Sequence, residues 1–420
     1  MTNTIADIEE ADVILITGSN TTENHPVISS GVKRAITQKG TKLIVVDPRR
    51  IRITRYADKW LRQNLGTDVA WINGLMHVII EEGLHDKQFI ESRTEGFDEL
   101  EKMVDKFTPD FVEQITGIPA QELIDAARLF ANAERGSILY CMGITQHTTG
   151  TDNVKSLANL AMLCGNMGIA GGGVNPLRGQ NNVQGACDMG GLPDVYSGYQ
   201  KVIDEAARER MTEAWGVDAL PDQPGMKVTH MMPAAHDGTF KAMYIIGENP
   251  VVSDADVNHA EKCLDNLDLM VVQDIFLTET AQLADVVLPS ACYAEKDGTF
   301  TNSERRVQRV RKAVEPPGEA WDDWKIFCEI ATRMGYPMAY NSSQQIMEEI
   351  SRVTPSYAGI SYERIEHEGL HWPCPTAEHP GTPILHGEQF TRGKGLFHAI
   401  DYIEPVGVPG AQGLAAEDRG

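Results

Sequence analysis

The sequence predicts an α/β fold with two parallel-sheet units related by pseudo-symmetry, followed by a smaller mixed α+β C-terminal segment. The main reason is an internal repeat. An apolar stretch ending in Gly18, a polar turn, a helix-length segment and a second apolar stretch ending in Asp47 recur around Gly247 and Asp274. In both copies an Ala-Asp pair follows, with its acid eleven residues after the first acid. A strand–helix–strand unit of this kind predicts parallel strands joined by a right-handed crossover.

The first copy shows the pattern in detail. Residues 12–17 form a short, nearly continuous apolar run, which is typical of a parallel strand covered on both faces. Pro26 fits the first turn of a helix, Gly40 fits its C-terminal stop, and residues 42–47 form the next strand. Both copies are therefore predicted to be Rossmann-like units, which bind nucleotides at the carboxyl ends of their strands.

Further elements follow in chain order. Before the second copy we expect a strand over 137–142, a glycine-dense loop from Gly165 to Gly190, and helices that begin at Gly66-Thr67-Asp68, span 119–132 and span about 153–165. After it we expect a hairpin or a pair of loops over 293–312 with Gly298 at a turn, helices over 321–334 and 343–352, a proline-rich loop over 372–382, and a ragged end over the last fifteen residues. The predicted domains are 1–180, 181–292 and 293–420.

Composition excludes several classes of function. The 420 residues are 42% apolar and carry a formal charge of −23, which argues against nucleic acid or an anionic membrane as a partner. No apolar run reaches the ~18 residues needed to span a bilayer, and the acidic N-terminus does not resemble a secretory signal. The seven cysteines are widely spaced without a C-x-x-C pair. This spacing predicts reduced thiols in a cytoplasmic protein, and no iron–sulfur or structural zinc site built by this chain alone.

The turn after the first strand of each copy is a candidate nucleotide site. Glycine there lets backbone N–H groups approach a phosphate, and the following helix N-terminus favours negative charge. Side chains that could bond to ribose or base edges are Asn20 and Glu23 in the first copy, and Glu248 and Asn249 in the second. The alternative is an ordinary α/β turn with helix caps, but the repeat favours a pair of nucleotide sites.

Acidic residues follow the second strand of each copy. There the carboxylates of Asp47 and Asp274 can accept hydrogen bonds from ribose hydroxyl or guanine N–H groups. Asp68 follows Gly-Thr at the start of a predicted helix, and for this residue alone helix capping is the favoured interpretation. The two roles are compatible.

The run from Asn175 to Gly190 combines an arginine with amides and glycines. This composition suits neither a helix nor a strand interior, so it favours a ligand-lined loop over a solvated surface loop. Arg178 could hold a carboxylate through a bidentate fork. The run from Met142 to His147 is a weaker candidate, and His147 is expected to be structural or exposed rather than a catalytic base.

Together these segments resemble a known family. In chain order they read GSNTTENHP, VVDPRR, MGITQ, LCGNMG, LRGQNNVQGACDMG, IGENP, QDIFLTETAQLADVVLPS and TRMGYPM. They are similar to formate dehydrogenase catalytic subunits of the molybdopterin oxidoreductase (dimethyl sulfoxide reductase) family, and the Arg178 segment is the most specific. That family holds molybdenum or tungsten between two molybdopterin guanine dinucleotides. The resemblance implies that the two copies are the halves of this double cradle.

The resemblance also implies roles for single residues. Arg178 would orient formate, which is oxidised to CO₂ while two electrons pass to the metal. One guanine nucleotide would lie against Gly18, Asn20, Asp47, Arg49 and Asp68, the other against Gly247, Asn249, Gln273, Asp274 and Ser290, and the pterins against Met142, Gly143, Gln146 and Gln180. The predicted cofactor site also includes Glu23, Gly66 and Glu248.

The chain also departs from the family pattern. Family members carry an N-terminal four-cysteine segment for a 4Fe–4S cluster, then a cysteine or selenocysteine that ligates the metal, and this sequence contains neither. We therefore expect the central portion of the enzyme, without the C-terminal domain that closes over the dinucleotides, inactive by itself and served by electron-transfer subunits in the full complex. The alternatives are a non-catalytic scaffold of the same fold, which the intact Arg178 segment disfavours, and another oxyanion oxidoreductase of the family.

Overall fold

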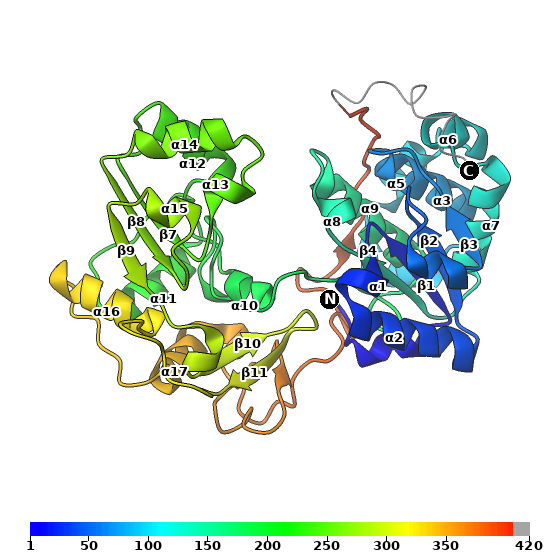
Figure 1. Cartoon of the computed structure of the whole chain (residues 1–420). Helices are drawn as coiled ribbons and strands as arrows, with labels where there is room; N and C mark the ends of the chain where they lie inside the picture. Colours follow the sequence, from blue (N-terminus) through cyan, green and yellow to red (C-terminus); the bar gives the residue numbers. More distant parts are fainter. Residues whose placement is uncertain (406–420) are drawn as a thin grey trace. The chain divides into compact units, whose positions relative to one another are not determined.

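The computed structural model describes residues 1–405, so the predicted ragged end over 406–420 lies outside the described residues. The contacts of the chain divide it into two compact units (Figure 1). The first unit comprises Met1–Asn181, Ser303–Arg305 and the residues from Thr382 onward, and the second comprises Asn182–Asn302 and Arg306–Gly381. The division into three domains stays a prediction.

The first unit is built around a parallel sheet of five strands in the order β3-β2-β1-β5-β6. These strands are β1 (Val13–Thr17), β2 (Lys42–Val46), β3 (Lys59–Leu61), β5 (Gly136–Tyr140) and β6 (Val174–Pro176), while β4 (Thr94–Glu95) pairs with β13 (Gly395–Leu396). The helices are α1 (Thr21–Asn24), α2 (Pro26–Arg34), α3 (Asp68–Glu81), α4 (Lys87–Arg93), α5 (Phe97–Val104), α6 (Pro109–Thr116), α7 (Ala120–Ala131), α8 (Met142–Thr145) and α9 (Gly150–Leu163). Short 3-10 or π turns are η1 (Ala6–Glu10), η2 (Ala35–Lys39) and η3 (Arg52–Tyr56).

Strand β1 lies at the centre of this sheet. Val13 pairs in parallel with Lys42 of β2 on one side and with Gly136 of β5 on the other. The chain thus first extends the sheet from β1 to β2 and β3, and later returns to the other side of β1. A reversal of this kind leaves a crevice at the carboxyl ends of the two strands that flank it, here β1 and β5.

Side chains of the central strand alternate between two apolar cores. Val13 and Leu15 lie in the core that includes α3, α7 and α9, whereas Ile14 and Ile16 lie in the core that includes α2. All residues of β1 and β5 are buried, which confirms the predicted parallel strand covered on both faces. Burying each large apolar side chain in this way contributes about 1.5–3 kcal/mol.

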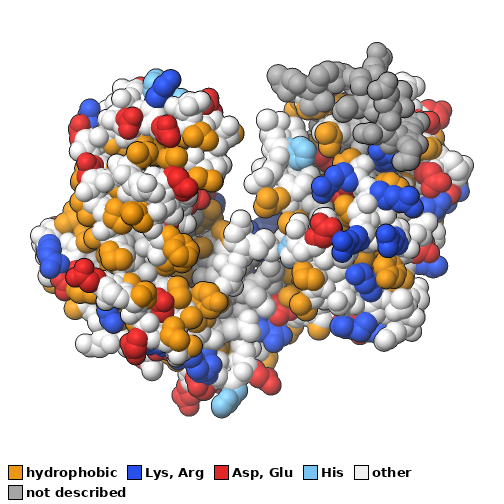
Figure 2. Space-filling model, in the orientation of Figure 1, with side chains coloured by type: hydrophobic (Ala, Val, Ile, Leu, Met, Phe, Trp, Pro, Cys, Tyr) orange, Lys and Arg blue, Asp and Glu red, His pale blue; other side chains and the backbone are white. Residues whose placement is uncertain are grey.

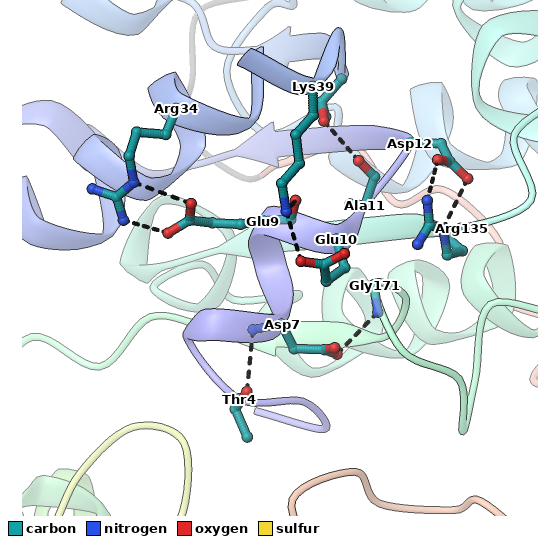
Figure 3. Close-up of polar contacts among 11 residues, drawn as sticks. Thr4, Asp7, Glu9, Glu10, Ala11, Asp12, Arg34, Lys39, Arg135 and Gly171 are labelled. Atoms are coloured by element: carbon teal, nitrogen blue, oxygen red, sulfur yellow. Dashed lines mark hydrogen bonds and ion pairs between the residues drawn. The ribbon is translucent and has the colours of Figure 1, made fainter. Parts of the chain in front are cut away.

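Polar contacts fix the N-terminal region around η1 and the segments near Arg305 and Thr382 to the first unit. Acidic side chains near η1 each meet a partner from another segment, the contacts being Glu9–Arg34, Glu10–Lys39, Asp12–Arg135 and Asp7–Gly171 N (Figure 3). The guanidinium of Arg305, only 2% exposed, donates hydrogen bonds to the backbone carbonyls of Met1, Thr382 and Pro383. These bonds explain why Ser303–Arg305 and the residues after Thr382 belong to the first unit.

The second unit contains two small sheets. The parallel sheet has the order β7-β8-β9, with β7 (Ala242–Ile246), β8 (Leu269–Asp274) and β9 (Val286–Pro289), and the antiparallel sheet consists of β10 (Gly298–Thr301), β11 (Arg306–Val310) and β12 (Leu370–His371). The helices are α10 (Val183–Asp188), α11 (Glu205–Trp215), α12 (Val228–His236), α13 (Pro250–Ser253), α14 (Val257–Asp265), α15 (Glu279–Gln282), α16 (Asp323–Arg333) and α17 (Ser343–Val353). The 3-10 turns are η4 (Ser197–Tyr199), η5 (Tyr293–Glu295) and η6 (Pro355–Tyr357).

Hydrophobic side chains are exposed on this unit, as the visible face in Figure 2 shows. They include Ile246 and Val286 of the parallel sheet and Phe276, which is 72% exposed. One apolar core of the unit lies between α12, α14 and the parallel sheet, and a second lies around β11, α17 and η6. In the part of the chain that the structure describes, no helix combines the length and the apolar character that crossing a bilayer requires.

Most of the predicted elements are present at the predicted places. The helices expected at Gly66, 119–132, 153–165, 321–334 and 343–352 correspond to α3, α7, α9, α16 and α17. The hairpin over 293–312 is also present, but the prediction of its turn at Gly298 was wrong. Gly298 begins β10, and the chain reverses between Asn302 and Arg306, where the Asn302 side chain accepts a hydrogen bond from Arg306 N over 3.0 Å.

Candidate nucleotide-binding site

A cavity of about 580 Å³ lies at the carboxyl edge of the sheet in the first unit. Segments that directly follow β1, β2, β3, β5 and β6 contribute to its wall, because the carboxyl ends of parallel strands meet at one edge. Nine of the predicted cofactor residues line it: Gly18, Asn20, Asp47, Arg49, Gly66, Asp68, Met142, Gly143 and Gln180. Glu23, Gln146 and Arg178 are not among the lining residues.

Two glycines bring the backbone segments after β1 and β5 into direct contact. Gly18 follows β1 with a φ of +56°, in the left-handed region that favours glycine. Its carbonyl accepts a hydrogen bond from Gly143 N over 3.0 Å. A Cβ atom at Gly18 would lie 2.6 Å from the Gly143 carbonyl carbon, so a side chain at Gly18 would collide with backbone. The glycine is therefore required by both the turn and the close approach of the two strands.

The Asn20 side chain is available to a ligand rather than used as a helix cap. Asn20 holds the N-cap position of α1 but makes no capping hydrogen bond with its side chain. Its Nδ2 donates to Glu23 Oε2 over 2.9 Å, whereas its Oδ1 is buried and has no partner among the described residues. Glu23 itself is exposed, with Oε1 3.7 Å from Arg52 Nε. Asn20 thus presents an unused acceptor at the cavity.

The Asp47 carboxyl is buried at the end of β2, with 5% of the residue exposed. Its Oδ1 accepts a hydrogen bond from Arg49 N over 2.8 Å, and its backbone carbonyl accepts one from Trp60 Nε1 over 2.9 Å. Burial raises the pKa of Asp47, and the Arg49 N–H opposes this only in part. A buried carboxyl and the exposed Arg49 therefore line the same cavity.

Asp68 does not cap its helix, so the favoured capping interpretation was wrong. Thr67 occupies the N-cap position, and Asp68 is the first helical residue of α3. The Asp68 carboxyl, which is almost fully buried, accepts a hydrogen bond from Trp71 Nε1 over 3.3 Å. Burial raises the pKa of Asp68, while Trp71 and the nearby His147 oppose the shift.

The cavity also contains residues that the sequence did not single out. Its wall includes His25 and Gln63. His25 Nε2 donates to the Arg178 carbonyl over 2.8 Å, which leaves Nδ1 as an unpartnered acceptor. Gln63 Oε1 is likewise buried without a partner. The only sequence signal for His25 is its position directly before the helix-starting Pro26.

His147 was expected to be structural or exposed, and the structure places it half-buried in the cavity wall. Its Nε2 donates to the Gly143 carbonyl over 2.8 Å and lies 3.9 Å from Asp68 Oδ2. It therefore connects the glycine turn after β5 to the buried carboxyl at the start of α3.

Arg178 is the second residue after β6, next to Gly179 and Gln180 of the cavity wall. The residue is half-buried, and its Nε has no hydrogen-bond partner among the described residues. Tyr140 at the end of β5 lies near the Arg178 guanidinium. Burial raises the pKa of Tyr140 to about 12, against the opposing charge of Arg178. Arg178 thus faces a phenol that stays neutral at physiological pH.

The strand ends of the second copy are more exposed. Gly247 follows β7 with a φ of +60°, but a Cβ atom there would meet nothing within 4 Å. Glu248 is exposed and Asn249 is half-buried. The Asn249 Oδ1 accepts hydrogen bonds from the backbone N (3.1 Å) and Oγ1 (2.7 Å) of Thr280, and its Nδ2 donates to Glu279 over 2.8 Å.

The remaining predicted residues of the second copy are engaged within their own unit. The fully buried Gln273 donates through Nε2 to Asp323 Oδ1 over 2.7 Å, and its Oε1 accepts a hydrogen bond from the Tyr244 hydroxyl. Asp274 Oδ1 accepts a hydrogen bond from Phe276 N over 2.9 Å. Ser290 N donates to the Asp274 carbonyl over 3.1 Å, which joins the ends of β8 and β9.

Comparison with known proteins gives consistent matches. The family model described as molybdopterin oxidoreductase matches residues 1–333. The F420-dependent formate dehydrogenase subunit alpha of Methanocaldococcus jannaschii is 52% identical, over 97% of this chain and 61% of its own length. Formate dehydrogenase H of Escherichia coli is 45% identical, over 97% of this chain and 57% of its own length.

Among solved structures, acetylene hydratase from Pelobacter acetylenicus matches with a TM-score of 0.70 at 25% identity, over 94% of this chain and 58% of that chain. The chain therefore spans about three fifths of the length of the curated relatives named above.

Proposed function

Because the chain belongs to the molybdopterin oxidoreductase family, we propose that it forms the part of a formate dehydrogenase that holds two molybdopterin guanine dinucleotides. The observation that carries this proposal is the 52% identity to a formate dehydrogenase alpha subunit over 97% of the chain. One dinucleotide is assigned to each copy of the repeat. The substrate is formate and the product CO₂.

The first-unit cavity supports this assignment because its polar atoms fit the group. The wall offers unpartnered acceptors on Asn20, His25 and Gln63, together with the buried carboxyls of Asp47 and Asp68. A guanine ring presents N–H and amino donors and a ribose presents hydroxyls, so each would satisfy such acceptors. The guanidinium of Arg49, at the same wall, would meet a phosphate.

The bound cofactor supplies a molybdenum or tungsten centre that accepts two electrons as formate is oxidised. Arg178 binds the formate carboxylate through its guanidinium, whose Nε is unused by the described residues. Because Tyr140 stays neutral, the positive charge of Arg178 is not cancelled and remains available to the anion. Gly18 and Gly143 let the backbone segments after β1 and β5 approach each other closely at the cavity wall.

The electrons must then leave the site, so we propose electron-transfer subunits as partners of this chain. The seven cysteines are all free thiols in the structure, which suits a reducing cytoplasmic compartment.

The cofactor assignment is tested by measuring nucleotide content. The protein is co-expressed with the cofactor-synthesis machinery, and the GMP released by acid hydrolysis is quantified. We expect Asp47→Ala to lower the GMP content severalfold, because the cavity loses a buried acceptor. The matched control is Asp58→Ala, which removes the other acid of the same copy, outside the cavity wall. Equal GMP content in wild type and Asp47→Ala would contradict the assignment.

The role of Arg178 is tested by formate-dependent dye reduction in the complete formate dehydrogenase that contains this chain, because the chain alone is expected to be inactive. We expect Arg178→Lys to lower kcat/KM for formate by about 10–100-fold, because the bidentate geometry is lost while the charge remains. GMP content should stay at the wild-type level. Arg352→Lys, on the exposed surface of α17, is the control. If Arg178→Lys keeps wild-type kcat/KM, the carboxylate-binding role fails.

A further inference from the structure

Two histidines and a cysteine converge in the second unit, on residues that the proposed cofactor site does not use. His259 and Cys263 lie one turn apart on α14, and His236 is the last residue of α12. One potential ligand atom from each residue lies within 4.8 Å of the other two. Cys263 is buried, His259 is half-buried and His236 is exposed, so the cluster opens to solvent on one side.

The spacing of these atoms is close to that of ligands on a metal ion. Cys263 Sγ lies 3.4 Å from His259 Nε2. A tetrahedral zinc ion with Zn–S of about 2.3 Å and Zn–N of about 2.05 Å holds sulfur and nitrogen about 3.6 Å apart. The His236 ligand atom lies within 4.8 Å of the other two, and its ring centre is 5.5 Å from that of His259, so an ion that binds all three would draw the His236 ring toward the third corner of such a tetrahedron.

The backbone around the cluster is well supported. Asn266 Nδ2 donates to the His236 carbonyl over 2.9 Å, which fixes the end of α12 to the end of α14. The N-cap Asp256 accepts a hydrogen bond from His259 N over 3.1 Å. Cys263 packs in the apolar core against the small residues that let α12 and α14 approach, including Ala235 and Ala260. Ligands on two packed helices therefore hold their separation without a flexible loop.

The local charge also favours a cation. The carboxylates of Asp254 and Asp256 add negative charge near Cys263. Asp237 directly follows His236, and the carbonyl end of α12 carries partial negative charge. A divalent ion would be attracted by all of these groups and would displace the thiol proton to solvent on binding.

We propose that His236, His259 and Cys263 bind a divalent transition-metal ion, with Zn²⁺ the best match to two imidazoles and a thiolate. A water molecule takes the fourth position. The ion links α12 to α14 and so stabilises the packing of these two helices in the second unit. Cysteine spacing alone predicts no zinc site, because His236 reaches the cluster only through the packing of two helices.

The competing explanation is an ordinary S–H···N hydrogen bond between Cys263 and His259. Such a bond needs neither His236 nor a metal. The two explanations differ in what Co²⁺ does when it is added to the metal-stripped protein. A thiolate-ligated Co²⁺ ion absorbs in the near ultraviolet through sulfur-to-metal charge transfer, whereas a histidine-only surface site does not.

The experiment titrates the full 420-residue chain, stripped with a chelator, with Co²⁺ and then with Zn²⁺. We expect one tight equivalent, the charge-transfer band, and a rise in unfolding temperature on Zn²⁺ addition. Cys263→Ser and His259→Gln should each weaken binding by more than about 100-fold, beyond the 10–100-fold cost of losing an outer-shell partner. His236→Gln, at an exposed helix end where folding is unaffected, should weaken binding in the same direction.

Matched controls come from the same unit. His230→Gln alters another exposed histidine of α12, and Cys328→Ser alters a half-buried cysteine of α16, so both should bind like wild type. The proposal is overturned by any of three results: no Co²⁺ or Zn²⁺ uptake by the wild-type chain, uptake without the charge-transfer band, or unchanged affinity in His236→Gln. None of these measurements depends on formate oxidation.

Discussion

The two copies of the strand–turn–helix–strand repeat share a backbone plan but differ in their surroundings. In the first copy β1 is the fully buried centre of a five-stranded sheet, and a cavity lies at its carboxyl end. In the second copy β7 is the edge of a three-stranded sheet, and most of its residues are partly or fully exposed. The comparison shows that a repeated sequence specifies local hydrogen bonding, whereas the environment of each copy depends on what packs around it.

The acids of the repeat illustrate the shared plan. Asp58 Oδ2 accepts a hydrogen bond from Leu43 N over 2.9 Å, and Asp285 Oδ2 accepts one from Met270 N over 2.7 Å. Each acid therefore joins the start of the third strand of its copy to the second strand. These acids recur because both copies use them structurally, and neither is needed to explain nucleotide binding.

The asparagines after the strand-end glycines illustrate the divergence. Asn20 Oδ1 is buried without a partner, whereas Asn249 Oδ1 accepts two hydrogen bonds from Thr280. Equivalent positions in the repeat thus hold an available acceptor in one copy and a satisfied structural residue in the other. Substitutions at matched positions test how far the two copies differ.

The largest difference in stability between matched variants of the two copies is expected at the strand-end glycines. Alanine at either Gly18 or Gly247 costs about 1–2 kcal/mol for the left-handed backbone. Only Gly18→Ala adds a collision with the Gly143 backbone, for a further cost of about 1–3 kcal/mol. Urea unfolding followed by hydrogen exchange of each unit measures both variants. Equal losses of stability in the two would show that the crevice between β1 and β5 can relax.

Substitution of the asparagines should destabilise the second copy more than the first, the opposite of the result expected for the glycines. Asn249→Ala leaves the buried Thr280 N–H without its acceptor and should destabilise the second unit by about 1–3 kcal/mol. Asn20→Ala should change stability by less than about 0.5 kcal/mol, as is usual for residues without such contacts, but should lower GMP content. Thermal unfolding of both variants measures the change in stability, and nucleotide analysis measures the change in GMP content. A larger loss of stability in Asn20→Ala would mean that its Oδ1 has a structural role.

The structural acids should behave alike. Asp58→Ala and Asp285→Ala each remove a charged acceptor from a strand N–H, at an expected cost of about 1–2 kcal/mol. Faster hydrogen exchange at Leu43 or Met270 is the local sign of that loss. GMP content should be unchanged in both variants. If Asp285→Ala changed neither stability nor hydrogen exchange while Asp58→Ala changed both, the two copies would not share the structural role of this hydrogen bond.

The smallest effect is expected from pH at Asp47. Burial raises the folded-state pKa of this carboxyl above its unfolded value of about 3.9, so the unfolded chain loses the proton first as pH rises. The wild type is therefore penalised above the unfolded-state pKa, and Asp47→Asn should be more stable than wild type at pH 7.

That gain should shrink as the pH falls through the folded-state pKa, and it should disappear below the unfolded-state value of about 3.9, where Asp47 becomes protonated in both the folded and the unfolded chain. Thermal unfolding of the nucleotide-free protein across this pH range is the measurement. Asp274→Asn, at the half-buried equivalent position, provides the comparison. A stability gain in Asp47→Asn that does not depend on pH would contradict the role of burial.

Local patterns in the sequence predicted the elements well. The continuous apolar run at 12–17, the proline at helix start and the glycine stops correspond to observed strand and helix limits, because these signals act over a few residues. The hairpin turn was misplaced because an asparagine side chain, rather than Gly298, closes it. Asp68 was misread as a cap because sequence spacing cannot tell the N-cap from the first helical residue.

The sequence by itself determined the repeat, the parallel-sheet class and the segments that lie at the strand ends, since these depend on periodicity and on turn chemistry. Only the tertiary structure decided which of those segments form a cavity, that His25, Gln63 and His147 belong to it, and that Asn249 and Gln273 are already bonded within their unit. The same holds for the cluster at His236. Burial and the pairing of side chains depend on residues far apart in the chain, and strand order and helix packing bring those residues together.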